Sequence, residues 1–270
     1  MGSGSCFVTG RRSRGKERRM KRWVAIGDSF TYLNDHCEET GGRLHKGYVT
    51  RTLEQLAGCE VELINIGFNG STFDNWRAIC VPKADVYTVL LGTNDWKQNY
   101  PLGTESDFNN SVRGSILGNC GILLRHIREV SPMAPILVMT PVERGEFVYV
   151  GDYTNNFHDS SVPENGLMLA DVAKAIRFCC ERSGVTVIDL HEKSGFTPEN
   201  AVKFKRVVTP DGLKDLPWPD YTCFRFDPEK HPYPYPVECQ GMTYDGLHPS
   251  DEGAQIIADL LAPELRKALA

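Results

Sequence analysis

The chain has 270 residues, of which 41% are hydrophobic and 24% charged, and its formal net charge is −5. These values are typical of a single α/β domain that can bury a substantial core. Residues 1–19 hold six Lys or Arg residues and one Glu, so the rest of the chain is more acidic than the total indicates. An acidic body argues against a nucleic-acid-binding surface.

The basic start of the chain is predicted to be a disordered extension or leader over residues 1–20, followed by one domain over residues 21–270. A nucleic-acid-binding tail is the alternative, but no aromatic residues are interleaved with the basic ones. No apolar run of the length that a secretory signal needs follows this segment, and no stretch approaches a membrane span. We therefore expect a cytoplasmic protein, while its oligomeric state stays open.

The chain contains nine cysteines, an odd number, and no pair has Cys-x-x-Cys spacing. Several lie in apolar segments, where a free cysteine behaves as a small hydrophobic residue. We interpret them as reduced thiols. A disulfide between Cys223 and Cys239 under oxidising conditions is the alternative.

Short apolar runs alternate with helical patterns along nearly the whole sequence. The runs predicted to be strands are residues 23–26, 61–66, 86–91, 136–140 and 185–190. Apolar residues at three- and four-residue intervals predict helices over residues 48–56, 111–130, 164–181 and 253–269. This alternation predicts a three-layer α/β/α fold with a five-stranded, mostly parallel sheet.

Two long connections interrupt this alternation, at residues 141–162 and 197–243. We call residues 197–243 the insertion. Loops of this length in a compact domain are usually functional or disordered. The proline and aromatic content of the insertion favours an ordered cover beside the functional site, and surface packing over the sheet edge is the alternative.

Polar motifs follow the first three predicted strands directly. They are Gly27-Asp28-Ser29, Gly67-Phe68-Asn69-Gly70 and Gly92-Thr93-Asn94-Asp95, and Asp245-x-x-His248 lies beyond the fifth strand. Open parallel sheets bind ligands at the carboxyl ends of their strands, so these motifs are expected to converge on one site.

The residue types in these motifs fit nucleophilic catalysis. Ser29 comes where a strand ends, so its hydroxyl can project from the sheet edge as a nucleophile. A serine hydroxyl needs a base, and His248 has an acid, Asp245, three residues upstream beside a turn. Asp245 would fix the tautomer of the imidazole and stabilise its cation.

The four motifs, in this order and at these separations, resemble the four blocks of the SGNH hydrolases, also called GDSL esterases. The resemblance spans about residues 23–269 and leaves out the basic start and the insertion. It implies the same fold, a Ser29–His248–Asp245 triad, and an oxyanion hole made of the backbone N–H groups of Ser29 and Gly70 with the side-chain amide of Asn94. Gly70 is preferred to Gly67 because the family's second-block glycine lies five residues after an asparagine.

Asp28 and Asp95 could act as further acids, but an aspartate beside a tight turn more often accepts hydrogen bonds from local backbone N–H groups. Together with Asp245 and His248 they could also indicate a metallophosphoesterase. The sequence has no His-x-His cluster, and the resembled family needs no metal. We expect no metal and no cofactor.

Aromatic residues near the expected site suit sugar rings as well as acyl chains, although each could equally be buried in the core. The candidate substrate contacts are Asp28, Trp96, Trp218 and Tyr235. Because the insertion is polar and rich in proline, it does not resemble the apolar lid of a long-chain lipase. We expect an ester with a short acyl group, such as an acetylated carbohydrate. A lysophospholipase, a thioesterase and a catalytically silent sugar-binding protein are the alternatives.

Overall fold

The computed structural model describes residues 19–270, so the predicted extension over residues 1–20 lies almost wholly outside the described residues. Five strands form a central sheet in the order β2-β1-β3-β4-β7, and every neighbouring pair is parallel. The strands are β1 (Lys21–Gly27), β2 (Val61–Gly67), β3 (Val86–Leu90), β4 (Ile136–Met139) and β7 (Thr186–Ile188). The predicted three-layer α/β/α fold is confirmed.

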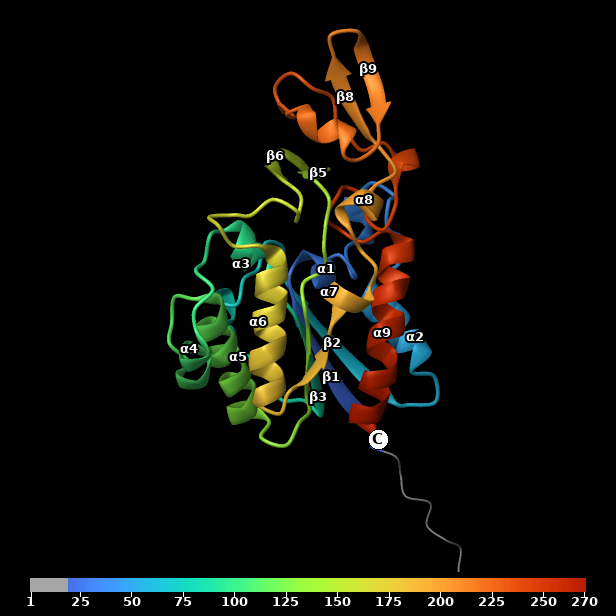
Figure 1. Ribbon diagram of the computed structural model, residues 1–270. Helices are drawn as coiled ribbons and strands as arrows, with labels where there is room; N and C mark the ends of the chain where they lie inside the picture. Colours follow the sequence, from blue (N-terminus) through green and yellow to red (C-terminus); the bar gives the residue numbers. More distant parts are fainter. Residues whose placement is uncertain (1–18) are drawn as a thin grey trace, which may run out of the picture.

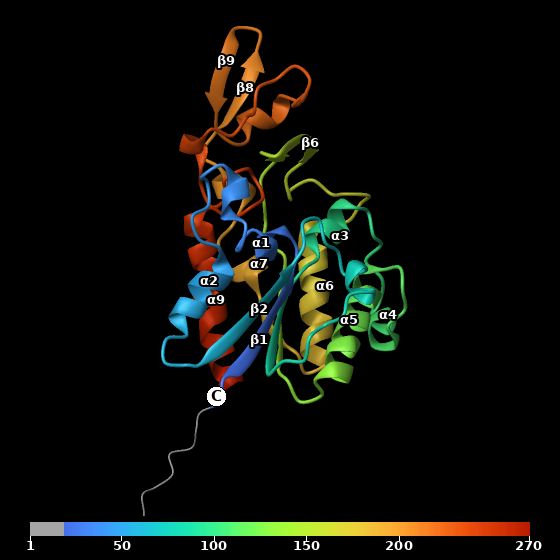
Figure 2. The ribbon, with the colours of Figure 1, turned by 180° about the vertical axis from the view of Figure 1, so that it is seen from behind.

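Helices cover both faces of this sheet, as Figures 1 and 2 show from opposite sides. The four covering helices are α2 (Tyr48–Gln55), α5 (Ile116–Val130), α6 (Leu169–Arg182) and α9 (Asp251–Leu269). The side chains of β1 alternate between the faces, as a pleated strand requires. Trp23 and Ala25 are buried in the cluster that includes α2 and α9, whereas Val24 and Ile26 are buried in the cluster that includes α5 and α6.

Three of the differences between predicted and observed bounds have a clear local cause. The fifth predicted strand ends early, because Asp189 caps a short helix, α7 (Leu190–Lys193). The helix predicted from residue 111 begins at Ile116 instead, because Ser111 adopts a left-handed conformation that ends α4 (Glu105–Asn110). The helix predicted from residue 164 begins five residues later, since Glu164 pairs with Leu167 in an isolated bridge.

Each long connection contains a two-stranded antiparallel hairpin that the sequence did not predict. The first is β5 (Phe147–Tyr149) with β6 (Asp152–Phe157), and the second, in the insertion, is β8 (Lys205–Thr209) with β9 (Gly212–Leu216). The insertion also contains α8 (Pro198–Ala201), η3 (Asp220–Cys223) and η4 (Val237–Cys239). Both hairpins lie beyond the end of the sheet at which α1 (Ser29–Tyr32) and α3 (Thr93–Lys97) are found (Figure 1). The ordered insertion therefore stands over the sheet edge where ligands are expected.

The remaining short helices are η1 (Cys37–Thr40) and η2 (Asn75–Arg77). All eight cysteines of the described segment are free thiols, and Cys223 and Cys239 do not form the disulfide that we considered as an alternative. The ninth, Cys6, lies outside the described residues. Within residues 19–270, no helix combines the length and the apolar character that a membrane crossing needs.

Candidate active site

Ser29 is held at the point where β1 turns into a helix. Asp28 caps α1, and its Oδ1 accepts a hydrogen bond from the backbone N–H of Phe30 at 3.1 Å. Gly27 lets the end of β1 pack closely against α1, because a Cβ at this position would lie 2.0 Å from the hydroxyl oxygen of Thr31. Ser29 is thereby the first residue of α1, and 8% of it is exposed at the carboxyl end of the strand.

The loop that carries His248 and Asp245 is stabilised by its own hydrogen bonds. Asp245 Oδ1 accepts from the backbone N–H groups of Leu247 at 3.0 Å and His248 at 2.8 Å. Asp245 Oδ2 lies 2.7 Å from His248 Nδ1. Gly246 has φ 93°, and a Cβ there would lie 1.8 Å from the carbonyl oxygen of Glu146, so only glycine fits this turn. The carboxylate and the imidazole are both buried.

The two ends of the chain meet at this loop, where His248 Nε2 lies 2.8 Å from Ser29 Oγ. Because Nδ1 faces the carboxylate of Asp245, it carries the proton, and Nε2 accepts the hydrogen bond from the Ser29 hydroxyl. The three side chains therefore form one chain of hydrogen bonds from the hydroxyl to the carboxylate. This is the geometry in which an imidazole can remove the proton of a serine.

Four aromatic rings surround the imidazole of His248. Tyr244 stacks on it with ring centroids 5.7 Å apart, and Phe30, Phe147 and Tyr149 contact it at 5.9, 5.4 and 5.8 Å. None of these four contacts was predicted from the sequence. Phe147 and Tyr149 come from β5, so the first hairpin forms one wall beside the base. For Phe147 and Tyr149, the aromatic content of the 141–162 connection was the signal that could have indicated a wall of the site.

The second and third motifs join the first through hydrogen bonds of Asn94. Its Nδ2 donates to the carbonyl oxygen of Ser71 at 3.1 Å and to Asp28 Oδ2 at 3.5 Å. Asn94 lies in the first turn of α3, after Gly92, which has φ 117°. The polar residues that follow β1, β2 and β3 therefore converge at one sheet edge, as predicted.

Gly67 and Gly70 have different environments. The N–H of Gly67 donates to Asn65 Oδ1 at 3.0 Å, and a Cβ at Gly67 would lie 2.3 Å from the backbone nitrogen of Tyr32. Gly70 has φ 70° and open space around its Cα, and no acceptor within residues 19–270 takes its N–H. The N–H of Gly70 is therefore available to a ligand, whereas that of Gly67 is used inside the fold.

Asp28 and Asp95 are buried, and both accept backbone hydrogen bonds. Asp95 accepts from the N–H of Phe73 at 3.0 and 3.3 Å, which ties α3 to the connection after β2. The prediction of a backbone-bonding role is confirmed, but for Asp95 the partner is distant in sequence rather than local. Burial raises the pKa of Asp28 to about 7 and that of Asp95 to about 8.

The GDSL-like Lipase/Acylhydrolase family matches residues 25–256. This match covers most of the chain and includes all four motifs. The chain belongs to this family. It is a GDSL-type hydrolase.

Solved structures share the fold of this chain. A "possible lipase" from Chitinophaga pinensis has 40% identity and a TM-score of 0.88, with 92% of this chain and 98% of that chain covered. A Lactobacillus plantarum protein has 21% identity and a TM-score of 0.58, covering 92% and 97%. A mutant acetyl-xylooligosaccharide esterase from Geobacillus has 14% identity and a TM-score of 0.53, covering 91% and 94%. A comparison with curated proteins gave no match.

Three candidate substrate contacts of this GDSL-type hydrolase are buried and hydrogen-bonded within the fold. Trp96 is buried, and its indole N–H donates to the carbonyl oxygen of Leu167 at 2.7 Å. Tyr235 is also buried, and its hydroxyl donates to the carbonyl oxygen of Glu146. Asp28 uses its carboxylate to cap α1. These hydrogen bonds stabilise the fold, and a substrate contact at any of the three residues stays a prediction.

Trp218, the fourth candidate, lies in the insertion. Its side chain packs against the small apolar cluster of this segment, whose buried members include Val207, Tyr221 and Tyr235. Its indole nitrogen is buried and has no partner in the described part of the chain. A substrate contact at Trp218 stays a prediction.

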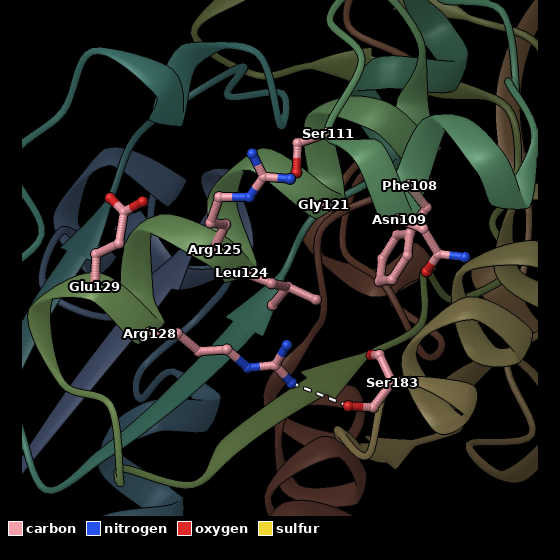
Figure 3. A pocket seen from close by; sticks show the side chains of 9 residues that line it. All are labelled: Phe108, Asn109, Ser111, Gly121, Leu124, Arg125, Arg128, Glu129 and Ser183. Carbon is pink, nitrogen blue, oxygen red and sulfur yellow. Dashed lines mark hydrogen bonds between the residues drawn. The ribbon is translucent and has the colours of Figure 1, made fainter.

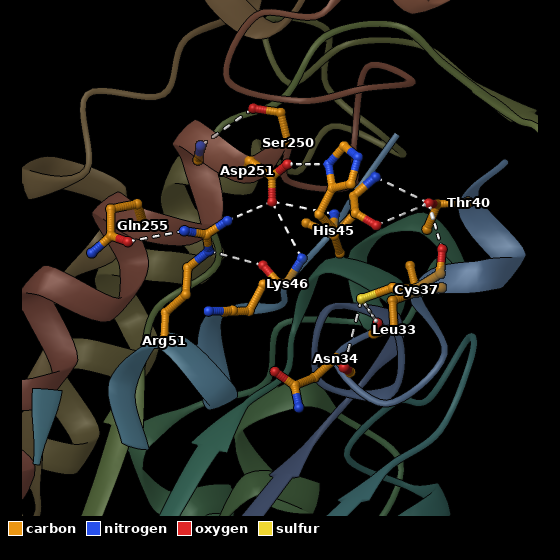
Figure 4. Close-up of polar contacts among 12 residues, drawn as sticks. Leu33, Asn34, Cys37, Thr40, His45, Lys46, Arg51, Ser250, Asp251 and Gln255 are labelled. Atoms are coloured by element: carbon orange, nitrogen blue, oxygen red, sulfur yellow. Dashed lines mark hydrogen bonds and ion pairs between the residues drawn. The ribbon is translucent and has the colours of Figure 1, made fainter. Parts of the chain in front are cut away.

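A polar network supports the His248 loop of the hydrolase from outside (Figure 4). Asp251, the first residue of α9, accepts from the backbone N–H groups of His45 and Lys46, both at 3.2 Å, and pairs with the guanidinium of Arg51. Its Oδ2 also lies 2.6 Å from His45 Nδ1. Although burial opposes it, hydrogen bonding from His45 and Arg51 lowers the pKa of Asp251. The network fixes the start of α9 three residues after His248.

A pocket of about 310 Å³ lies between α4 and α5, away from the triad (Figure 3). Its lining includes Phe108, Leu124, Arg125 and Arg128, and the guanidinium of Arg128 donates to the carbonyl oxygen of Ser183 at 3.1 Å. None of its lining residues belongs to the four motifs, so this pocket contributes nothing to the candidate active site.

Proposed function

We propose that this GDSL-type hydrolase removes short acyl groups from an alcohol, with acetyl first, through an acyl-Ser29 intermediate. The observation that carries the proposal is the hydrogen-bonded chain Ser29–His248–Asp245, with distances of 2.8 and 2.7 Å. His248 Nε2 takes the proton of Ser29 Oγ as this oxygen attacks the ester carbonyl carbon. The positive charge that develops on the imidazole is stabilised by Asp245.

The tetrahedral intermediate carries negative charge on the former carbonyl oxygen. We assign its donors to the backbone N–H groups of Ser29 and Gly70 and to the side-chain amide of Asn94. Neither N–H has an acceptor within residues 19–270. The contact between Asn94 Nδ2 and Asp28 Oδ2, at 3.5 Å, is at the long limit of a hydrogen bond, so the amide can exchange it for an oxyanion.

Collapse of this intermediate breaks the bond to the alcohol, and His248 returns its proton to the leaving oxygen. A water molecule then attacks the acyl-Ser29 carbonyl carbon while His248 accepts its proton, and the second collapse regenerates the Ser29 hydroxyl. No step of this reaction requires a metal ion.

The preference for a short acyl group rests on the insertion, which is polar and rich in proline and so does not resemble the apolar lid of a long-chain lipase. Phe30, Phe147, Tyr149 and Tyr244 contact the imidazole, with ring centroids 5.4 to 5.9 Å apart, and form the walls beside the base. A carbohydrate alcohol is the first candidate for the other half of the ester. A lysophospholipase or thioesterase with the same triad is the alternative, together with a sugar-binding protein that has lost turnover.

Hydrolysis of p-nitrophenyl esters from acetyl to decanoyl, by the parent and by Ser29→Ala, tests this proposal. We expect turnover that is highest for acetyl, resists EDTA and is lost in Ser29→Ala. A rate that rises steeply with acyl length would favour the lysophospholipase or thioesterase. Sugar binding that is unchanged in Ser29→Ala, with no turnover by the parent, would identify a binding protein.

A further inference from the structure

The side chain of Lys97 lies next to the proposed active site. It is the last residue of α3, three positions after Asn94, so the two lie on the same face of the helix. Its Nζ lies 5.1 Å from the ring centroid of Phe147 and 5.7 Å from that of Phe157. Phe147 also contacts the imidazole of His248, with ring centroids 5.4 Å apart. The ammonium and the imidazole therefore both contact the ring of Phe147.

Within the described part of the chain, no carboxylate contacts this ammonium directly, and the charge of Asp152 acts on it only from farther away. The hydrogen-bond partner of the ammonium is a neutral oxygen, Asn155 Oδ1, and no ion pair of 4.0 Å or less joins it to a carboxylate. Burial, together with the nearby charge of Arg144, lowers the pKa of Lys97 to about 8, although the charge of Asp152 opposes this shift. The other buried lysine in this region, Lys205, is paired with Glu146. A partly buried cation without an ion-pair partner destabilises a protein, because it loses hydration and gains no attraction to a carboxylate in return.

A second cation adds to this positive field. Arg144 is fully buried and lies over the rings of Trp96, Phe147 and Phe157 at 5.1 to 5.9 Å. One nitrogen of its guanidinium donates to the carbonyl oxygen of His158 at 2.8 Å, while Nε and Nη1 have no partner within residues 19–270. Arg144 is too deeply buried to meet a ligand, and the charges of Asp245 and Asp159 act on it, so Lys97 is the cation on this side that can reach an anion.

We propose that Lys97 binds a negative charge on the alcohol portion of the ester. The alcohol side is chosen because Phe147 packs on His248, which gives its proton to the leaving oxygen. The substrate class is then a short-chain ester of an alcohol that carries a carboxylate or a similar single anionic group, such as an acidic sugar. This inference rests on the proposed function and specifies its substrate.

Two acetyl esters that differ in one charge test this subsite. 4-Acetoxybenzoate carries a carboxylate on its alcohol portion, and 4-acetoxybenzamide is a neutral compound of nearly the same shape. The readout is the ratio of kcat/KM for the two esters, measured for the parent, Lys97→Met, Lys97→Arg and Lys267→Met. Lys267→Met is a matched control, because Lys267 is an exposed lysine near the far end of α9.

We expect the parent to prefer the anionic ester and Lys97→Met to lower that preference by about tenfold or more, mainly through KM. Lys97→Arg is expected to keep the preference, and Lys267→Met to leave it unchanged. An equal loss for both esters in Lys97→Met would overturn the proposal, because it would mean that Lys97 only holds the β5–β6 hairpin through Asn155. If the parent hydrolyses both esters with the same kcat/KM, the proposed anion subsite is overturned and the proposed function is not. A parent that hydrolyses neither would overturn the proposed function as well.

Discussion

Ser29 Oγ and His248 Nε2 lie 2.8 Å apart, although 219 positions separate the two residues in the chain. The parallel sheet explains this proximity, because it brings the end of β1 and the loop before α9 to the same edge. Asp28 fixes the position of Ser29 by capping α1, and Asp245 fixes that of His248 through three hydrogen bonds. The two halves of the site are thus built independently and meet only through the fold.

The side-chain amide of Asn94 is predicted to stabilise the transition state. Asn94→Ala should lower kcat for p-nitrophenyl acetate by about 10² to 10³ with little change in KM, because the donor acts on a charge that is absent from the ground state. Thermal unfolding should be followed in parallel, since Asn94 also donates to the carbonyl oxygen of Ser71. Wild-type kcat in a folded Asn94→Ala protein would remove Asn94 from the site.

The turn at Gly246 is predicted to tolerate no side chain. In Gly246→Ala the new Cβ would meet the backbone of Glu146, which cannot move aside as a flexible side chain could, so we expect a loss of about 3 kcal/mol or more in the free energy of unfolding. Gly70→Ala is the matched variant, with a similar positive φ but open space, and should cost only about 1–2 kcal/mol. Urea unfolding of both variants tests this, and equal losses would contradict it.

Asp95 is predicted to make the protein less stable as pH rises. Burial raises the pKa of Asp95 from 3.8 to about 8, so the folded state binds a proton that the unfolded state has already released. The free energy of unfolding therefore falls as pH rises from about 4 towards 8. Asp95→Asn removes this group and keeps an oxygen for the N–H of Phe73. Its gain over the parent should reach at least about 1 kcal/mol at pH 8.

Thermal melts of the parent and Asp95→Asn at pH 5 and pH 8 measure this difference. The advantage of the variant should be larger at pH 8 than at pH 5. Asp28, whose pKa is also raised, is present in both proteins, and its charge is one cause of the raised pKa of Asp95. A difference between the two proteins that stays the same at both pH values would show that Asp95 does not titrate in this range.

The sequence predicted the fold and the centre of the site because both depend on local patterns. Alternating apolar runs identify strands and helices, and a parallel sheet places Ser29 and Asn94 at one edge. The Asp245–His248 pair needs only a spacing of three residues. The resemblance to a known family then assigned Gly70 rather than Gly67, and the unused N–H of Gly70 agrees with that choice.

The walls of the site could not be predicted in the same way, because they depend on distant contacts. Phe147 and Tyr149 contact His248 from a hairpin that begins 101 positions earlier in the chain, and no spacing rule joins them. Trp96 and Tyr235 are buried in the structure, which the sequence pattern could not show for a related reason. An aromatic residue near a functional motif can face a ligand or fill the core, and only the packing decides between the two.

Covalent labelling tests whether Ser29 is the nucleophile that His248 activates. The parent, Ser29→Ala and His248→Ala should be treated with a fluorophosphonate and the modified peptide identified by mass spectrometry. We expect one adduct, on Ser29 of the parent. It should be absent from Ser29→Ala and should form far more slowly in His248→Ala. An esterase-active parent that is labelled elsewhere, or a Ser29→Ala protein that keeps its activity, would contradict this expectation.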